Sequence, residues 1–155
     1  MKNEIEKKFL VVSESYKEIA NEKYKIKQGY ISETKKAVTR VRISNKAAYI
    51  TIKENKKEIS KLEFEYSIPI KEGQYLIENL CNDEIITKTR YIVEFEGFLW
   101  EVDEFKGKNK GLVIAEIELE GETQKFSKPK WIGDEVTNDE RYYNINLMMN
   151  PFQKW

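Results

Sequence analysis

Pairs of charged residues two positions apart recur along the whole chain. The chain opens with Glu4, Glu6 and Lys8, and five further pairs each straddle an apolar or uncharged residue: Arg40/Arg42, Glu63/Glu65, Lys88/Arg90, Glu101/Asp103 and Glu116/Glu118. Because side chains alternate between the two faces of a β-strand, each pair lies on one face of its strand. The pattern therefore predicts six strands that share one charged face.

The charged face sets the fold class. An open sheet could bury its apolar face and expose its charged one, but here cations and anions segregate strand by strand. A closed antiparallel barrel accounts for this better, with the charged residues pointing into a lumen and the apolar face packing outward under helices near residues 15–20, 72–81 and 138–148. Buried unpaired ions are costly, so the lumen must be wet and roomy. We predict a mainly β (α+β) fold.

Hydrophobic alternation and turn residues place the elements. Strands are expected at residues 3–12, 24–32, 37–43, 47–53, 62–69, 85–94, 98–105 and 112–119. Ser44-Asn45-Lys46 and Glu96-Gly97 indicate hairpin turns. A helix over 71–82 would carry a buried, inert Cys81, and the segment 129–150 is expected to form a closing flap or cap helix.

Composition excludes several classes of protein. The 155 residues suit one domain, residues 1–155, and the 27 basic and 27 acidic residues leave no net field for nucleic acid or an anionic membrane. One cysteine excludes an intrachain disulfide framework and a cysteine-based zinc site, and the absence of histidine excludes histidine-based catalysis and the common imidazole metal sites. A metal would therefore be held by oxygen. No apolar run suits a signal peptide or a membrane span, which favours a cytoplasmic protein.

The residue types on the charged face suggest a ligand. The cations are suited to phosphate oxygens: Lys8, Arg40, Arg42, Lys53, Lys88 and Arg90. The carboxylates outnumber what salt bridges alone require and would bind a hard divalent ion: Glu4, Glu6, Glu63, Glu65, Glu116 and Glu118, with Asp103 as a further member. A linear polyphosphate would complete the charge balance. The alternative is a set of mutual salt bridges with no ligand.

The same residues form an ordered set of motifs. Glu4-x-Glu6-x-Lys8 resembles the ExExK signature of the CYTH superfamily, the triphosphate tunnel metalloenzymes. The likeness to the small bacterial members continues along the chain at Arg40-Val41-Arg42, Thr51-Ile52-Lys53, Glu63-Phe64-Glu65-Tyr66, Lys88-Thr89-Arg90-Tyr91, Trp100-Glu101-Val102-Asp103, Ala115-Glu116-Ile117-Glu118 and Trp131 with Glu135-Val136-Thr137. ExExK alone would be weak, but the ordered set is specific.

The resemblance implies an eight-stranded tunnel that binds triphosphates with Mg²⁺ or Mn²⁺ and reacts at phosphorus. Carried over, the six cations named above would grip the phosphates, and the glutamates with Asp103 would hold metal. Glu4, Glu6, Lys8 and Lys88 are the expected catalytic residues. One metal would bridge phosphate oxygens, and a second, held by Glu4 and Glu6, would lower the pKa of an attacking water.

Three functions stay open at this point. The favoured one is a triphosphatase acting on inorganic tripolyphosphate, with nucleoside or thiamine triphosphates as further substrates. The others are an adenylate cyclase that makes cyclic AMP from ATP and a non-catalytic polyphosphate- or nucleotide-binding module. Candidate selectivity residues at the lumen mouth are Tyr30, Tyr142 and Trp131. The expected partner is a small-molecule triphosphate, and the expected state is a monomer or homodimer.

Overall fold

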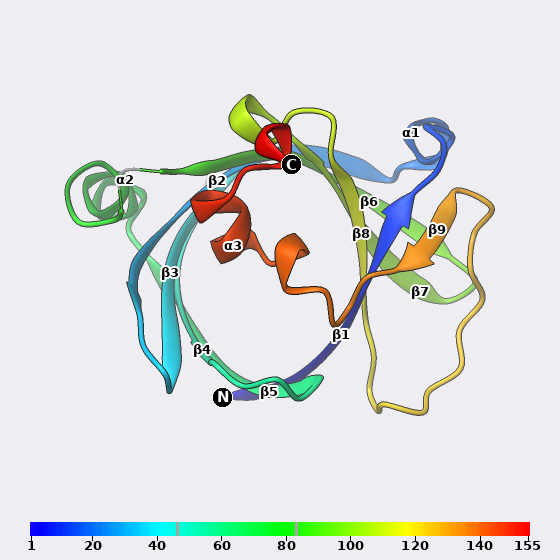
Figure 1. Ribbon diagram of the computed structural model, residues 1–155, viewed down its shortest axis with the longest axis horizontal. Coiled ribbons are helices and arrows are strands. Elements are labelled where there is room, and N and C mark those ends of the chain that lie inside the picture. The colour runs from blue at the N-terminus through cyan, green and yellow to red at the C-terminus, as the bar shows by residue number, and fades with distance from the viewer. Residues whose placement is uncertain (46, 83) are drawn as a thin grey trace.

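The computed structural model describes residues 1–45, 47–82 and 84–155. Within these residues, nine strands form one antiparallel sheet in the order β5-β4-β3-β2-β6-β7-β8-β1-β9, and β5 pairs with β1 as well. Because β1 meets β8 on one side and β5 on the other, strands β1 to β8 close into the barrel seen end-on in Figure 1. The predicted closed eight-stranded antiparallel barrel is confirmed.

The element bounds follow the alternation closely. The strands are β1 Lys2–Val11, β2 Glu22–Glu33, β3 Ala37–Ser44, β4 Ala47–Glu54, β5 Ser60–Ile68, β6 Ile86–Phe95, β7 Phe98–Phe105, β8 Val113–Glu118 and β9 Ile132–Glu135. The helices are α1 Tyr16–Ile19, α2 Ile70–Asn79 and α3 Asn144–Met149, with 3-10 turns η1 Gly107–Asn109, η2 Glu140–Tyr142 and η3 Phe152–Lys154. Each of the eight expected strands is present, with ends shifted by at most two residues.

Turn chemistry closes the hairpins. Between β6 and β7, Glu96 has φ 46° and Gly97 has φ 82°, the left-handed pair that a two-residue type I′ turn requires. The predicted turn at Glu96-Gly97 is therefore confirmed. In the β3–β4 hairpin Asn45 also has positive φ, 56°, while Lys46 lies outside the described residues.

Strand β1 is the seam of the barrel. Its first half pairs with β5, its second half pairs with β8, and beyond the end of β5 the free edge is taken by β9, where Val11 opposes Ile132. The sequence did not predict β9, because four residues containing Gly133 and two acids carry no usable alternation. The result is that β1 has partners on both edges.

One apolar core lies outside the barrel wall. Phe9, Trp100 and Trp131 are almost fully buried there and meet edge to face, with ring centroids 5.6 Å apart for Phe9–Trp100 and 5.8 Å for Trp100–Trp131. Tyr16 of α1 packs on Trp131 at 5.9 Å and helps to cover this side. The outward apolar face expected from the alternation is therefore present, and it is stabilised by aromatic packing.

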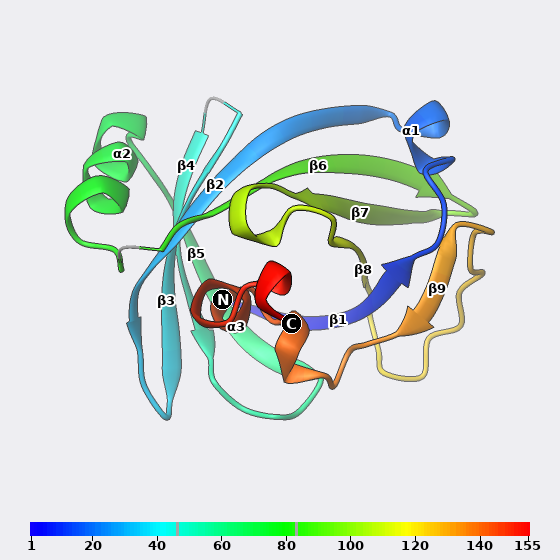
Figure 2. The same ribbon diagram turned by 45° about the horizontal axis from the view of Figure 1, so that its top comes forward.

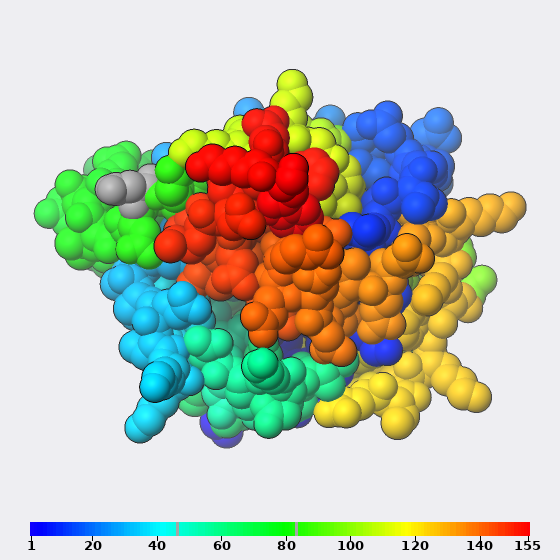
Figure 3. Space-filling view, in the orientation of Figure 1, coloured from blue at the N-terminus to red at the C-terminus, as the bar shows by residue number. Residues whose placement is uncertain are grey.

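The C-terminal segment covers one end of the barrel, as Figures 1 and 3 show. Leu147 and Met148 of α3 pack against Ile86, Phe105 and Ile114, which share a strand face with the charged lumen residues but are apolar. The expected cap helix is confirmed. The expectation that residues 138–148 cover the outer face is wrong, because the strand ends at this opening present apolar side chains inward and need an apolar plug.

Helix α2 covers the outside of the barrel beside β2, β3 and β4, at the left of Figure 2. Gly73 allows this close approach, because a Cβ at that position would lie 2.6 Å from Ala48 Cβ. The predicted place of a buried Cys81 on this helix is wrong, because α2 ends at Asn79 and Cys81 lies just beyond it, half-buried. Burial raises the pKa of its thiol, in keeping with an inert cysteine. Among the described residues no helix is long and apolar enough to span a membrane.

Candidate functional site

The strand register brings the charged residues together inside the barrel. On the two neighbours of β1, Lys8 opposes Glu116, Glu6 opposes Glu118 and Glu4 opposes Lys61. On the other strands Lys53 opposes Glu63 and Arg90 opposes Asp103. Cations and carboxylates from different strands thus face one lumen, as the charge pattern of the sequence predicts.

Two cavities of about 430 Å³ and about 910 Å³ occupy the lumen. The smaller one is roofed by the C-terminal segment, including Tyr143, and the larger one extends to the opposite rim at Leu119 and Gln124. They share six lining residues: Glu4, Glu6, Lys8, Arg40, Lys53 and Asn144. These residues therefore form the middle of a tunnel that continues on both sides.

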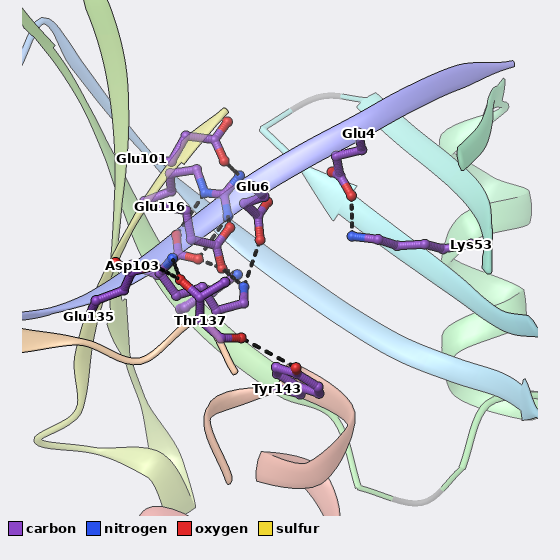
Figure 4. A network of polar contacts seen from close by, with 12 residues as sticks. Glu4, Glu6, Lys53, Glu101, Asp103, Glu116, Glu135, Thr137 and Tyr143 are labelled. Atoms are coloured by element: carbon purple, nitrogen blue, oxygen red, sulfur yellow. Dashed lines mark hydrogen bonds and ion pairs between the residues drawn. The ribbon is translucent and has the colours of Figure 1, made fainter. Parts of the chain in front are cut away.

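Ion pairs connect the middle of the tunnel (Figure 4). Lys8 Nζ donates to Glu6 Oε1 at 2.8 Å and also to Glu116 Oε1. Lys53 Nζ pairs with Glu4. Lys8 and Lys53 are thus held by carboxylates of the site, and a ligand must exchange these pairs for new ones.

Burial and neighbouring charges perturb the pKa values of these groups. Burial, reinforced by Glu116, raises the pKa of Glu6 to about 7. Burial also opposes ionisation of Glu4 and Glu116, but Lys53 beside Glu4 and Lys8 beside Glu116 outweigh it and hold both pKa values below the usual range. Glu6 is therefore the carboxyl of this group that changes its charge near neutral pH.

An ion cluster extends from the surface of the larger cavity into the barrel wall behind it. Asp103 accepts from Lys88 Nζ and receives a bidentate pair from Arg90, through Nε and Nη2 at 2.7 Å each. Arg90 also donates to Glu101. Lys88 and Asp103 are 1% exposed at their side chains and line neither cavity, whereas Arg90 and Glu101 line the larger one.

The arginines of β3 keep donors available. Arg42 Nη2 donates to Glu65 at 3.2 Å, and Arg40 Nη2 reaches Thr51 Oγ1 at 3.4 Å. The Nε groups of Arg40 and Arg42 are buried without a hydrogen-bond partner among the described residues. An unsatisfied buried donor is costly, so these two groups suit an anion in the tunnel.

The remaining predicted carboxylates lie toward one end. Glu63 and Glu65 line the larger cavity, and burial beside Glu4 raises the pKa of Glu63. Glu118 lines the same cavity near its rim and pairs with Lys2 at 2.6 Å. These three residues are on the lumen wall, further from the middle of the tunnel than Glu4 and Glu6.

The carboxylates in the middle of the tunnel fit a hard divalent cation. The negative charge of Glu116 opposes ionisation of both Glu4 and Glu6, and Glu4 opposes that of Glu6, so the three carboxylates lie near one another. Within residues 1–45, 47–82 and 84–155 no three acidic side chains converge on one point. Mg²⁺ commonly binds through one or two carboxylates together with substrate phosphates, which is the arrangement this donor set allows.

Sequence reasoning missed several lining residues. Lys61 lies on the same face of β5 as Glu63 and Glu65, so the two-residue alternation of the strand could have identified it. Tyr143 and Asn144 come from the C-terminal segment, where no strand alternation signals a lumen position. Their place in the site depends on contacts far apart in the sequence.

The three candidate selectivity residues lie in different places. Tyr30 lines the smaller cavity, and its hydroxyl accepts from Gln28 Nε2 at 3.2 Å. The prediction that Trp131 lies at the mouth of the lumen is wrong, because its side chain is buried in the outer core against Trp100. Tyr142 packs on Trp155 with ring centroids 5.2 Å apart and lines neither cavity, so it is not a mouth residue either.

A closed barrel whose lumen is lined by both cations and carboxylates defines a tunnel protein for a polyanion together with a cation. A family model described as the CYTH domain matches residues 2–146, and the chain belongs to the CYTH family. A protein of Acetivibrio thermocellus named inorganic triphosphatase is 50% identical over 155 residues, covering 100% of this chain and 99% of that protein.

Two further comparisons agree. An inorganic triphosphatase of Nitrosomonas europaea is 31% identical over 151 residues, covering 95% of this chain and 97% of the relative. A solved structure described as the inorganic triphosphatase NE1496 superposes with a TM-score of 0.67 at 30% identity, covering 96% of both chains. The likeness therefore extends over nearly the whole length of each protein.

Proposed function

We propose that this protein is an inorganic triphosphatase that hydrolyses the terminal phosphoanhydride of tripolyphosphate inside the barrel, with a divalent cation. The assignment of the substrate rests on the 50% identity, over the full chain, to a protein named inorganic triphosphatase. The geometry supports it, because a tunnel lined by both signs of charge suits a polyanion that arrives with a cation. We further propose a monomer or homodimer in the cytoplasm.

The cations of the lumen bind the phosphates. Arg40 and Arg42 contribute the Nε donors that have no partner in the described chain, and Lys8 and Lys53 contribute ammonium groups from the middle of the tunnel. Arg90 completes the set in the larger cavity, where Asp103 fixes the orientation of its guanidinium. Such preorganised donors stabilise charge on the bridging oxygen as it leaves.

Lys88 lies behind these phosphate-binding groups, in the barrel wall. Its ammonium is held by Asp103 at the back of the wall, and both side chains are closed to the cavities. We propose that this pair keeps Arg90 in place and adds positive charge below the phosphates. Lys88 is therefore a positioning residue in this proposal.

Glu4, Glu6 and Glu116 would hold the divalent cation, Mg²⁺ or Mn²⁺, with Glu63, Glu65 and Glu118 as further carboxylates toward the rim. Membership of the CYTH family implies such an ion. When bound, it supplies positive charge to the phosphate oxygens and lowers the pKa of a water for attack on phosphorus. Glu6 must be ionised to take part, and its pKa of about 7 makes this dependent on pH.

The experiment is phosphate release from tripolyphosphate, ATP and thiamine triphosphate with Mg²⁺, with Mn²⁺ and with a chelator. We expect tripolyphosphate to be hydrolysed with the highest kcat/KM and the chelator to stop the reaction. No release from any substrate under either metal would refute the proposal. Cyclic AMP formed from ATP would identify a cyclase instead.

A matched pair of arginine variants tests the binding role. Arg42→Met removes a buried guanidinium from the tunnel, whereas Arg141→Met removes one from the surface, where it pairs with Asp139. We expect KM for tripolyphosphate to rise about tenfold or more in the first variant, since a charge-assisted contact is lost. The Arg141 variant should behave as wild type. Equal kinetics in both variants would exclude Arg42 from substrate binding.

A further inference from the structure

Lys61 is a tunnel lysine outside the proposed phosphate-binding set. It lies on β5 opposite Glu4 of β1, two residues before Glu63 and on the same strand face. Its side chain lines the smaller cavity and is half-buried. The residue therefore adds a cation to the side of the tunnel that the C-terminal segment covers.

The charge of Lys61 is available to an anion. Three other lysines of the smaller cavity are paired: Lys53 with Glu4, Lys56 with Glu54 at 2.9 Å and Lys57 with Glu140 at 3.7 Å. In the part of the chain that the structure describes, no carboxylate lies within 4.0 Å of Lys61 Nζ. Lys61 Nζ instead lies 5.4 Å from the ring centroid of Tyr143. A cation–π contact of this kind orients the ammonium without neutralising it.

Tyr143 is itself held in position over the tunnel. Its hydroxyl donates to the backbone carbonyl of Thr137 at 3.3 Å, and Thr137 Oγ1 accepts from the backbone N–H of Lys8 at 3.1 Å. Figure 4 shows Tyr143 and Thr137 beside the ion pairs of β1. The ring that contacts Lys61 is thus tied to the strand that supplies the ExExK residues.

Cations therefore lie on both sides of the middle of the tunnel, although those on the larger-cavity side also pair with carboxylates of the wall. Arg42 and Arg90 line only the larger cavity, and Lys61 lines only the smaller one. Inorganic tripolyphosphate has a free terminal phosphate at each end, whereas a nucleoside triphosphate has one free end and one ester. A tunnel with donors at both ends matches the first substrate better than the second.

We propose that Lys61, positioned by Tyr143, binds the second free terminal phosphate of tripolyphosphate and so favours inorganic over nucleoside triphosphates. The proposal rests on the triphosphatase function proposed above. An esterified end lacks the second charge of a free terminal phosphate, so the contact with Lys61 stabilises it less. Lys61 is thus a specificity-determining residue.

The test compares Lys61→Met with Lys35→Met. Lys35 lines the same cavity from the exposed β2–β3 loop, so its loss removes the same formal charge from the same mouth. The measured quantities are kcat and KM for tripolyphosphate and the inhibition constant of ATP as a competitor, with thermal unfolding as a check of folding. Lys61→Arg keeps the charge and serves as the conservative variant.

We expect Lys61→Met to raise KM for tripolyphosphate about tenfold with kcat changed less, while ATP inhibition stays within about twofold. Lys61→Arg should restore most of the binding, and Lys35→Met should match wild type. An unchanged KM, or an equal weakening of tripolyphosphate and ATP, would overturn the proposal. A wild-type protein that does not hydrolyse tripolyphosphate would instead refute the function itself, so the two failures are distinguishable.

Discussion

Lys8 Nζ donates to the carboxylates of both Glu6 and Glu116, which lie on the adjacent strands β1 and β8. One ammonium is therefore the shared counter-ion of two acids in the middle of the tunnel. Ligand binding would exchange partners: phosphate oxygens would take Lys8, and a divalent cation would take the carboxylates. Before any ligand enters, the internal ion pairs of Lys8 offset the cost of burying these charges in the lumen.

Lys8→Met should destabilise the protein more in chelator than in the presence of a divalent metal. Removing the shared cation leaves two buried carboxylates facing each other, and breaking a buried pair in this way costs about 3–5 kcal/mol. We expect the free energy of unfolding in chelator to fall by that amount, and divalent metal to restore part of it, because the ion replaces the lost charge. Urea unfolding with and without Mg²⁺ measures both effects.

The control for Lys8 is its neighbour Lys7. Lys7 faces outward and pairs with Glu135 at 3.5 Å. Lys7→Met should change the free energy of unfolding by less than about 1 kcal/mol, as surface pairs do, and should leave hydrolysis intact. If both variants lost stability equally, the shared counter-ion would not be the cause.

The raised pKa of Glu6 predicts how the stability of the metal-free protein depends on pH. Its pKa is raised from 4.5 to about 7 in the folded state, so between these values the folded protein holds a proton that the unfolded chain has released. Stability must then fall as pH rises through this window. Glu6→Gln stays neutral and should therefore unfold at a higher temperature than wild type at pH 8 in chelator, with no gain at about pH 4.5.

Thermal unfolding of wild type and Glu6→Gln between about pH 4.5 and pH 8 checks whether stability falls as the pH rises. Glu14→Gln is a suitable control, because Glu14 is exposed and its ion-pair partner within the described residues is Lys17, three positions along, at 2.9 Å. The same melting difference between Glu6→Gln and wild type at every pH would contradict the raised pKa. Activity gives an independent readout, since Glu6→Gln should need more metal for half-maximal rate at pH 8.

Asp103→Asn distinguishes whether Asp103 stabilises the ion cluster or binds the metal. It accepts from Lys88 and Arg90 and lines neither cavity, so Asp103→Asn leaves two buried cations with weaker partners. We expect a loss of about 3–5 kcal/mol in the free energy of unfolding and an unchanged metal concentration for half-maximal activity. Glu116→Gln, in the middle of the tunnel, should raise that concentration instead.

The outcome for Asp103 also tests the sequence-based assignment of this residue to the metal. A shift in metal requirement as large as that of Glu116→Gln would support direct metal binding by Asp103. Isothermal titration with Mn²⁺ on each variant measures the same difference without relying on turnover.

The sequence predicts the barrel because charge repeats every second residue on so many strands. Lys88, Asp103 and Glu116 were correctly assigned to one inward face by this rule alone. The same rule places Ile86, Phe105 and Ile114 on that face, but it cannot tell what fills the space beside them. The plug by Leu147 and the edge pairing of β9 depend on long-range packing, which short apolar segments do not encode locally.

Leu147 is the side chain on which this plug depends. It is fully buried among Ile86, Phe105 and Ile114, while Asn109 Nδ2 donates to its backbone carbonyl at 3.2 Å. Leu147→Ala should lower the free energy of unfolding by about 2–5 kcal/mol, because it leaves a cavity in a packed cluster. Met149→Ala is the control, since Met149 is 73% exposed on the same helix.

The same pair of variants tests whether the plug also maintains the smaller cavity. Tyr143 and Asn144, which line that cavity, lie just before Leu147 in the chain, so loosening α3 should disturb them. We expect KM for tripolyphosphate to rise in Leu147→Ala at temperatures where the protein remains folded, and to stay unchanged in Met149→Ala. A destabilised Leu147→Ala protein with wild-type KM would show that the plug stabilises the barrel without shaping the substrate site.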